Sequence, residues 1–133
     1  RPSTWRTIEV TTHVGKQIQK NPGVARTVII DCVTLLVNNI FTKYTGPAGE
    51  ITDAALLEKE VTAEIKELIA CLDSTAADFI IVTNEVGLGL VPLNPMARLY
   101  RDLLGKANQL LAARADEVYL LVAGLPVKIK PAR

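Results

Sequence analysis

The hydrophobic positions of this chain fall into short apolar runs and longer amphipathic stretches. Short runs rich in β-branched residues occur at 27–32, 78–82 and 117–122. All three are predicted strands, the run at 27–32 is predicted to be buried, and the apolar run at 78–82 is typical of a strand buried on both faces of a parallel sheet. Two further extended segments are predicted, one at 5–10 with alternating faces and an edge strand at 127–130 with outward lysines.

Apolar residues recur at helical spacing at 34–41, 53–72 and 95–114. Thr52 and Asp53 are candidate caps for the second of these helices, and Pro95 suits the first turn of the third. Strands that alternate with helices indicate βαβ units with right-handed crossovers. The pattern therefore predicts one α/β domain over residues 1–133, with a mostly parallel sheet between helices in a three-layer arrangement.

Three local features refine this prediction. A short helix is expected within 11–20, capped by Thr11 or Thr12. The polar face of the helix at 53–72 carries a run of Glu and Lys, which predicts a solvated surface with i,i+4 ion pairs. Gly105 interrupts the apolar stripe of the last helix and suggests close packing there.

Composition and charge narrow the functional classes. The chain has 133 residues, 49% of them hydrophobic, and 15 basic against 14 acidic side chains give a net charge of +1. This balance argues against nucleic-acid and membrane-surface binding, and no apolar run reaches membrane-spanning length. The two cysteines, Cys32 and Cys71, lie in apolar contexts and favour a reducing, cytoplasmic setting. The start at Arg1-Pro2 without Met leads us to expect a piece of a longer chain.

The stretch 83–92 is the strongest functional candidate. Asn84 and Glu85 follow a strand, and ligands bind at the carboxyl ends of the strands in open parallel sheets. Gly87 and Gly89 would permit unusual backbone angles or a close approach to a ligand. The alternative is a glycine-rich turn in which Glu85 only accepts a hydrogen bond from a neighbouring main-chain group.

Acidic residues follow two other predicted strands. Asp31 lies at the carboxyl end of the predicted strand at 27–32, where a carboxylate could hold Mg²⁺ together with substrate phosphates. The alternative role for Asp31 is to cap the helix that follows it. Glu9 ends the extended segment at 5–10, so Glu9, Asp31 and Glu85 are predicted to share one edge of the sheet.

Other polar residues give weaker signals. His13, the single histidine, has no Cys, Ser or acid at motif spacing and is interpreted as a surface residue. No Gly-x-x-x-x-Gly-Lys-Ser/Thr, paired-cysteine or Gly-x-Ser-x-Gly motif is present. The helix predicted at 95–114 follows the stretch 83–92. Its polar residues could bind phosphate, or they could only link helices by salt bridges. These residues are Arg98, Arg101, Asp102, Asn108 and Gln109.

Several motifs occur in a fixed order along nearly the whole chain. They are Arg1-Pro2-x-x-Trp5-x-Thr7-x-Glu9, Asp31-Cys32-x-Thr34, Asn84-Glu85-Val86-Gly87-x-Gly89-x-Val91-Pro92, Arg101-Asp102-x-x-Gly105-x-x-Asn108-Gln109 and Ala123-Gly124-Leu125-Pro126. The series closely resembles the bifunctional adenosylcobinamide kinase / adenosylcobinamide-phosphate guanylyltransferase family of cobalamin (vitamin B12) biosynthesis.

This resemblance implies a P-loop NTPase fold of the RecA-like type. It also implies a kinase that phosphorylates adenosylcobinamide with ATP or GTP and a guanylyltransferase that then transfers GMP from GTP through a guanylylated histidine. Mg²⁺ and a homotrimer are implied as well, with neither nucleic acid nor a membrane span involved.

The resemblance carries over residue by residue only in part. It implies nucleotide-binding roles for Arg1, Glu9, Asp31, Asn84 and Glu85. Of these, Asp31 also serves the metal and Glu85 is a weak catalytic candidate. The same motifs leave Arg101 and Asp102 as either active-site or packing residues.

The family's P-loop, in its first βα unit, and its nucleophilic histidine both precede the position of Arg1, and His13 does not match that histidine. We therefore expect the 133 residues alone to be nearly inactive, or to act as an α/β binding or oligomerisation module.

Overall fold

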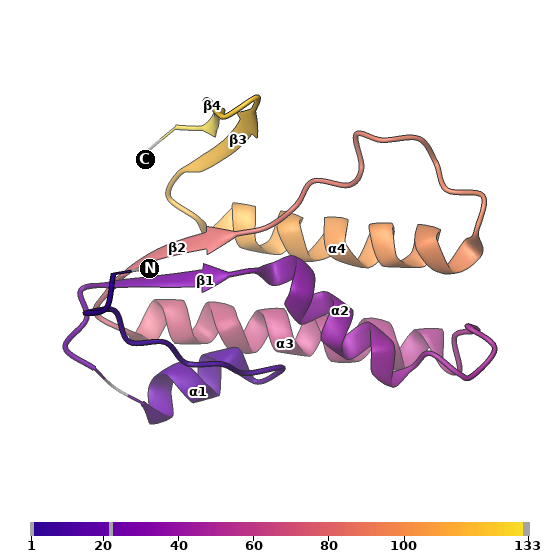
Figure 1. The fold of residues 1–133 in the computed structure, drawn as a ribbon, viewed down its shortest axis with the longest axis horizontal. Coiled ribbons are helices and arrows are strands. Elements are labelled where there is room, and N and C mark those ends of the chain that lie inside the picture. The colour runs from indigo at the N-terminus through magenta and orange to yellow at the C-terminus, as the bar shows by residue number, and fades with distance from the viewer. Residues whose placement is uncertain (1, 22, 132–133) are drawn as a thin grey trace.

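The computed structural model describes residues 2–21 and 23–131, and its helices and strands alternate along much of the chain (Figure 1). In chain order the elements are α1 (Val14–Lys20), β1 (Thr27–Asp31), α2 (Val33–Lys43), α3 (Ala54–Ser74), β2 (Asp78–Val82), α4 (Pro95–Arg114), β3 (Val118–Val122) and β4 (Leu125–Lys130).

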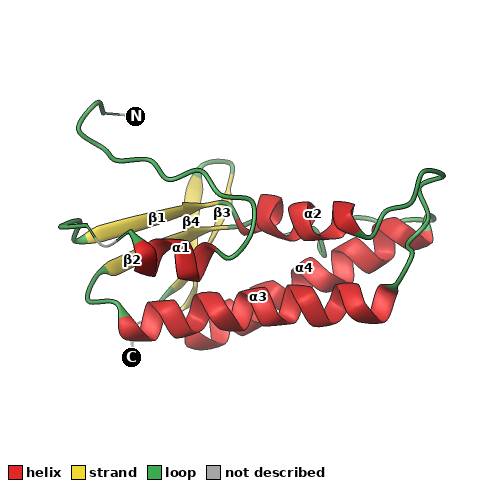
Figure 2. Ribbon diagram, turned by 90° about the horizontal axis from the view of Figure 1, so that it is seen from below, coloured by secondary structure: helices red, strands yellow, loops and turns green. Residues whose placement is uncertain are grey.

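Strands β1 and β2 pair in parallel, with a register that runs from Thr27 opposite Asp78 to Asp31 opposite Val82. Their side chains alternate between a face that packs against the helical core and a face that is exposed to solvent. Figure 2 shows α3 and α4 lying on one side of this strand pair. The predicted crossover between parallel strands is confirmed, because α2 and α3 lie between β1 and β2 in the chain.

The burial of β2 differs from the prediction. Phe79 and Ile81 pack against the helical core, whereas Ile80 is 52% exposed and Val82 is also exposed. The expectation of burial on both faces is therefore wrong for this strand. A continuous apolar run records only that each side chain is apolar, and it does not show which face a helix covers.

Strands β3 and β4 form an antiparallel hairpin that is separate from the β1–β2 pair within the described residues. The turn residues Ala123 and Gly124 have φ values of 51° and 79°. Such a two-residue turn with both φ values positive matches the twist of the strands it joins. The expectation that the strand at 117–122 joins the parallel sheet is thus not met here, although the mixed α/β class is.

Lys130 attaches this hairpin to the end of α4. Its ammonium group donates hydrogen bonds to the main-chain oxygens of Ala112, Ala113 and Ala115, at 2.9, 3.0 and 2.5 Å. These carbonyls lie where a helix leaves its last oxygens without intrahelical partners. The lysine was expected to point outward, and the structure corrects this for Lys130.

The main core lies between α2, α3 and α4. Local signals predicted two of these helices well: α4 begins at Pro95, and the Asp53 carboxylate accepts a hydrogen bond from the Leu56 N–H at 2.9 Å. None of the helices within 2–21 and 23–131 combines the length and apolar character needed to traverse a bilayer. The largest fully buried side chains are Ile40, Leu57, Ile65, Leu68, Leu104, Val33, Val37 and Cys71.

The segment before α1 is not a strand, contrary to the prediction for residues 5–10. Its side chains are exposed, Trp5 by 53%. An alternating pattern fits a strand only if another strand offers its main-chain groups, and none pairs with these residues in the described structure.

The cap of α1 also differs from the prediction of Thr11 or Thr12. The residue at the helix start is His13, with φ 57°, and its own side chain makes no capping bond. Instead, Glu64 of α3 accepts hydrogen bonds from the main-chain N–H groups of His13 and Val14, at 2.8 and 2.9 Å.

The prediction of a solvated charged face on α3 is confirmed only in part, because Glu58, Lys59 and Lys66 are exposed whereas Glu64 is buried. Glu64 is only 5% exposed. The acids of this face find partners outside α3, because α1, α2 and α4 all contact this helix. The ion pairs are Glu58–Lys106, Glu60–Lys43 and Glu67–Lys16.

Two helical glycines have opposite surroundings. A Cβ added at Gly15 would lie 2.7 Å from the main-chain oxygen of Glu67, so α1 and α3 approach closely there. A Cβ at Gly105 would meet nothing within 4 Å. Close packing was predicted at Gly105 and is found at Gly15.

Candidate functional site

The carboxyl edge of the β1–β2 pair gathers the best candidate residues. Because Asp31 lies opposite Val82 in parallel register, Asp31 and the residues that follow β2 emerge at the same edge. This placement of Asp31, Asn84 and Glu85 agrees with the sequence analysis. From this edge, Figure 1 shows the loop 83–94 running along α4 before it turns into that helix.

Asn84 is held through its main chain by two helices. Its N–H donates to the Thr34 hydroxyl oxygen at 3.0 Å, and its carbonyl accepts from Nδ2 of Asn108 at 3.0 Å. The Thr83 hydroxyl donates to Oδ1 of the same Asn108 at 2.7 Å. Side chains of α2 and α4 thus form hydrogen bonds with the residues that directly follow β2.

Sequence reasoning did not single out Thr34 as a functional residue and left Asn108 among several polar residues. The signal that could have found them is positional. Thr34 lies in the first turn of the helix after β1, and Asn108 lies on the helix after β2. A helix that follows a strand can bring a polar side chain back over the strand's carboxyl edge.

Tyr100 ties α4 to the start of α2. Its hydroxyl donates to the main-chain oxygen of Thr34 at 3.1 Å, and its ring packs edge-on against Phe41 with centroids 5.4 Å apart. Burial raises the pKa of the Tyr100 hydroxyl above its ordinary value of 10, and the nearby Cys32 adds to the effect. The hydroxyl therefore remains a donor at neutral pH.

The carboxylate of Asp31 is exposed and makes no hydrogen bond or ion pair with any other described residue. The alternative in which it caps the next helix is not what is seen, because Cys32 occupies the cap position of α2 without a side-chain bond. The peptide bond between Asp31 and Cys32 is cis. An unpaired carboxylate at a strand end is free to bind a cation.

Glu85 is partly engaged by its own turn. Its Oε1 accepts a hydrogen bond from the N–H of Gly87 at 2.6 Å. A Cβ at Gly87 would lie 2.7 Å from that oxygen, but the exposed Glu85 side chain could move away, so this contact does not by itself require a glycine. Neither Gly87 nor Gly89 has a positive φ, and the expected unusual backbone angles are absent from this turn.

The arginines of α4 are engaged by their neighbours. Arg98 donates from one nitrogen to the main-chain oxygens of Pro92 and Leu93, at 2.9 and 2.8 Å, and so closes the end of the loop. Arg101 pairs with Asp102 at 3.5 Å. The expected salt bridges to another helix are not seen for Arg98, Arg101 or Asp102 among the described residues, and the phosphate-binding alternative stays a prediction.

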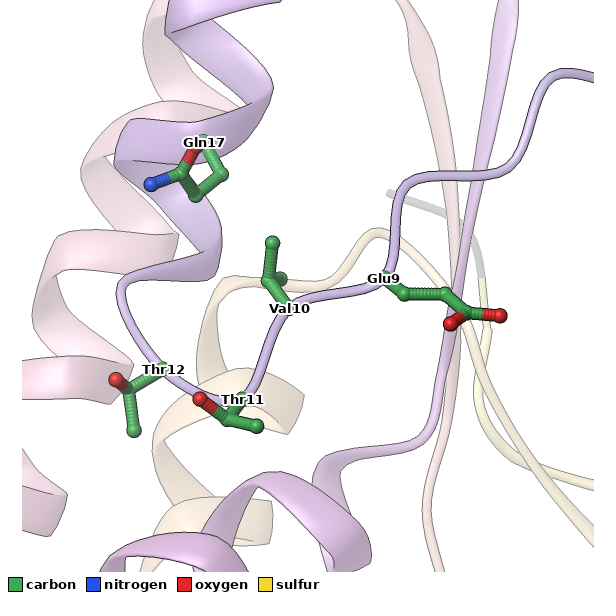
Figure 3. Close-up of a pocket in the computed structure, with 5 residues that line it drawn as sticks. All are labelled: Glu9, Val10, Thr11, Thr12 and Gln17. Carbon is green, nitrogen blue, oxygen red and sulfur yellow. The ribbon is translucent and has the colours of Figure 1, made fainter.

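Glu9 lies elsewhere than at the end of a strand. It lines an open hollow of about 410 Å³ with Val10, Thr11, Thr12 and Gln17, and Figure 3 shows its carboxylate directed away from Thr12 and Gln17. The predicted convergence of Glu9 with two strand-end acids is therefore not produced by the sheet. Arg1, the other proposed nucleotide ligand at this end of the chain, lies outside the described residues.

His13 is an exposed residue, as interpreted from the sequence. Its Nδ1 lies 3.3 Å from Oε2 of Glu67, a partner that motif spacing could not reveal because it is 54 residues away. Partial burial opposes ionisation of Glu67, but hydrogen bonds from Lys16 and His13 outweigh it and lower the pKa of this carboxyl. The contact ties α1 to α3.

No group of three or more His, Cys, Asp or Glu side chains suited to a metal occurs in the described part of the chain. Mg²⁺, however, is often held by one or two carboxylates together with substrate phosphates and water. The Asp31 carboxylate, exposed at the strand end, fits that mode of binding.

Comparison with known proteins gives one consistent result. A family model described as "Cobinamide kinase / cobinamide phosphate guanyltransferase" (CobU) matches residues 1–129. The chain is 41% identical over 131 residues to the bifunctional adenosylcobalamin biosynthesis protein CobU of Escherichia coli, which covers 98% of this chain and 72% of that protein. The protein of the same name from Salmonella typhimurium gives the same values. CobP of Pseudomonas aeruginosa is 33% identical over 130 residues, 98% of this chain and 68% of that protein.

Proposed function

The chain belongs to the cobinamide kinase / cobinamide phosphate guanyltransferase family, and from this membership we propose how its residues serve the two reactions. It is an enzyme of cobalamin biosynthesis, a kinase and a guanylyltransferase. The first reaction transfers the γ-phosphoryl group of ATP or GTP to a hydroxyl of adenosylcobinamide. The second transfers GMP from GTP to the new phosphate and releases pyrophosphate. The observation that carries the assignment is the 41% identity across 98% of the chain.

Both reactions depend on positioning and on neutralising phosphate charge, rather than on covalent chemistry at many side chains. We place the phosphates at the carboxyl edge of β1 and β2, beside Asn84 and Glu85. The support is the parallel register, which brings Asp31 and the residues after β2 to one edge. An amide side chain there can donate to phosphate oxygens, whereas a lone carboxylate would repel them.

Mg²⁺ resolves this repulsion, and Asp31 is the residue that would hold it. Its exposed carboxylate lacks a partner among the described residues, and Mg²⁺ prefers hard oxygen ligands. When bound, the ion would neutralise the charge on the phosphates. Glu9 and Arg1 complete the proposed nucleotide-binding set, and for both the support is the match to the family's motif at Arg1-Pro2-x-x-Trp5-x-Thr7-x-Glu9.

The proposal extends to the surrounding fold and assembly. We propose a three-layer sheet of the P-loop NTPase type, one domain over residues 1–133, a homotrimer and a cytoplasmic location. Exposed apolar side chains on the hairpin, among them Leu121 and Leu125, are surfaces that subunit contacts could cover. The free thiols of Cys32 and Cys71 suit a reducing compartment.

The direct test uses the protein as its gene encodes it, incubated with adenosylcobinamide, GTP or ATP, and MgCl₂. Mass spectrometry should show the phosphorylated corrinoid and then its GDP derivative. Asp31→Asn should lower kcat by about 100-fold, because the substitution removes the charge that binds the cation. Asp116→Asn, at an exposed acid outside the site, should leave the rate unchanged. Absence of both products from the unmodified protein would refute the proposed function.

A further inference from the structure

The main chain of Asn84, just beyond the end of β2, is held by hydrogen bonds with side chains of two helices. The β1–β2 register ends at Val82, so no ladder partner remains for the groups that follow. Both hydrogen-bonding groups of the Asn84 backbone are nevertheless satisfied, by side chains from two different helices. Thr34 takes the N–H and Asn108 takes the carbonyl.

The two holding side chains are themselves oriented. The Thr83 hydroxyl donates to Oδ1 of Asn108, which leaves the Nδ2 group of that amide as the donor to Asn84. Tyr100 donates to the main-chain oxygen of Thr34 and so joins the first turn of α2 to α4.

The helices that carry these side chains are anchored in the core. Leu36 of α2 and Leu104 of α4 are both buried in the same hydrophobic cluster. Side chains that arise from packed helices hold a geometry more accurately than side chains that arise from a mobile loop.

The side chains that chemistry would use are left free by this arrangement. No hydrogen bond or ion pair joins the Asn84 amide side chain or the Asp31 carboxylate to other described residues. The result is a fixed main chain with available polar groups. Such preorganisation lowers a barrier because the enzyme need not reorganise as the reaction proceeds.

We propose that Thr34 and Asn108 are positioning residues, which hold the main chain of Asn84 so that its amide side chain meets the phosphates of the bound nucleotide. The inference rests on the proposed function of this sheet edge. Neither residue touches the substrate in this scheme. Their effect on turnover passes through Asn84.

The test compares Thr34→Val with Thr34→Ser in the protein as its gene encodes it. Valine keeps the shape of the side chain and loses the hydroxyl, whereas serine keeps the hydroxyl. We expect Thr34→Val to lower kcat by about 10- to 100-fold, with KM for GTP changed by less than about threefold, and Thr34→Ser to restore most of the rate. Thr42→Val is the matched control, because the Thr42 hydroxyl bonds only to Asn39 within the same helix.

A second variant guards against a folding defect. Asn108→Asp keeps the acceptor for Thr83 but loses the donor to Asn84, so it should lower kcat with little change in melting temperature. If Thr34→Val does not fold, the rate of Asn108→Asp decides the question.

The possible outcomes separate the positioning role from the proposed function. An active unmodified protein whose rate stays within twofold in the variants would overturn the positioning role and leave the proposed function standing. Equal losses in Thr34→Val and Thr34→Ser would also overturn it, because packing rather than the hydroxyl would then matter. An unmodified protein that forms neither product would overturn the proposed function and this inference together.

Discussion

Two helix ends in this molecule are capped by a charged side chain from another element. The start of α1 is capped by a carboxylate and the end of α4 by an ammonium group. Glu64 accepts hydrogen bonds from two N–H groups at the start of α1, and Lys130 donates to three carbonyl oxygens at the end of α4. Both signs match the partial charges of the helix ends.

The two capping side chains, Glu64 and Lys130, differ in their exposure to water. Glu64 is 5% exposed, whereas Lys130 is only partly buried and reaches the helix end from the hairpin. Water can replace the lysine more easily than the glutamate, so similar hydrogen-bond chemistry should contribute unequally to stability.

The largest effect is expected for Glu64→Ala. Losing two charge-assisted hydrogen bonds at a buried site should lower the free energy of unfolding by about 3 kcal/mol. Urea unfolding measures this change. The matched control is Glu58→Ala on the same helix, which removes only an exposed pair with Lys106 and should cost less than about 1 kcal/mol. Equal losses in the two variants would contradict the comparison.

Gly15→Ala should be the next most damaging change. The new Cβ would lie 2.7 Å from the main-chain oxygen of Glu67 and 3.2 Å from Cβ of Cys71, so α1 must move away from α3. We expect a cost of about 2 kcal/mol in urea unfolding. Gly105→Ala, in open space, should instead stabilise by roughly 0.5–1 kcal/mol through helix propensity. The same sign for both variants would refute the assignment of the close contact.

Lys130→Met should have a smaller effect than either change at α1. It removes the donor to three carbonyls at the end of α4, at an expected cost of about 1 kcal/mol that thermal unfolding would report. Lys128→Met on the same strand removes contacts with Glu117 and the Tyr119 ring, all within the hairpin. A larger fall in Tm for Lys128→Met would show that the hairpin, and not its attachment to α4, determines stability.

The smallest effect is a pH dependence at Glu67. Hydrogen bonds from Lys16 and His13 hold its pKa below the ordinary 4.5 despite partial burial. A carboxyl with a lowered folded pKa stabilises the protein above its unfolded pKa, and this contribution disappears as the pH falls through the folded value. The free energy of unfolding should therefore fall more steeply below about pH 4.5 in the unmodified protein than in Glu67→Gln. Parallel curves for the two proteins would exclude this role.

The sequence predicted the elements better than the contacts between them. The helices α3 and α4 were found because each combines an apolar period with a start signal that lies beside it in the chain, Asp53 for one and Pro95 for the other. Glu64 was misread as part of a solvated face. Its partners lie 50 and 51 residues away, beyond the reach of local periodicity.

At the candidate site too, the sequence predicted positions on the strands better than contacts between distant residues. Asp31 and Asn84 could be placed at one edge, because parallel strands share the direction of their carboxyl ends. Glu9 was misplaced, since alternation cannot tell a paired strand from an unpaired segment. Thr34 and Asn108 were not singled out, because a lone hydroxyl or amide on a helix has no motif spacing until the fold brings it to Asn84.

The attachment of α1 has a consequence for optical spectroscopy. The one tryptophan of the chain, Trp5, lies in the segment that leads into α1, and Arg6 beside it is hydrogen-bonded to Asn21 at the other end of that helix. Intrinsic fluorescence should therefore follow the release of this segment, whereas far-ultraviolet circular dichroism follows the packed helices α2, α3 and α4. The gap between the two unfolding curves would measure how independently the amino-terminal segment opens.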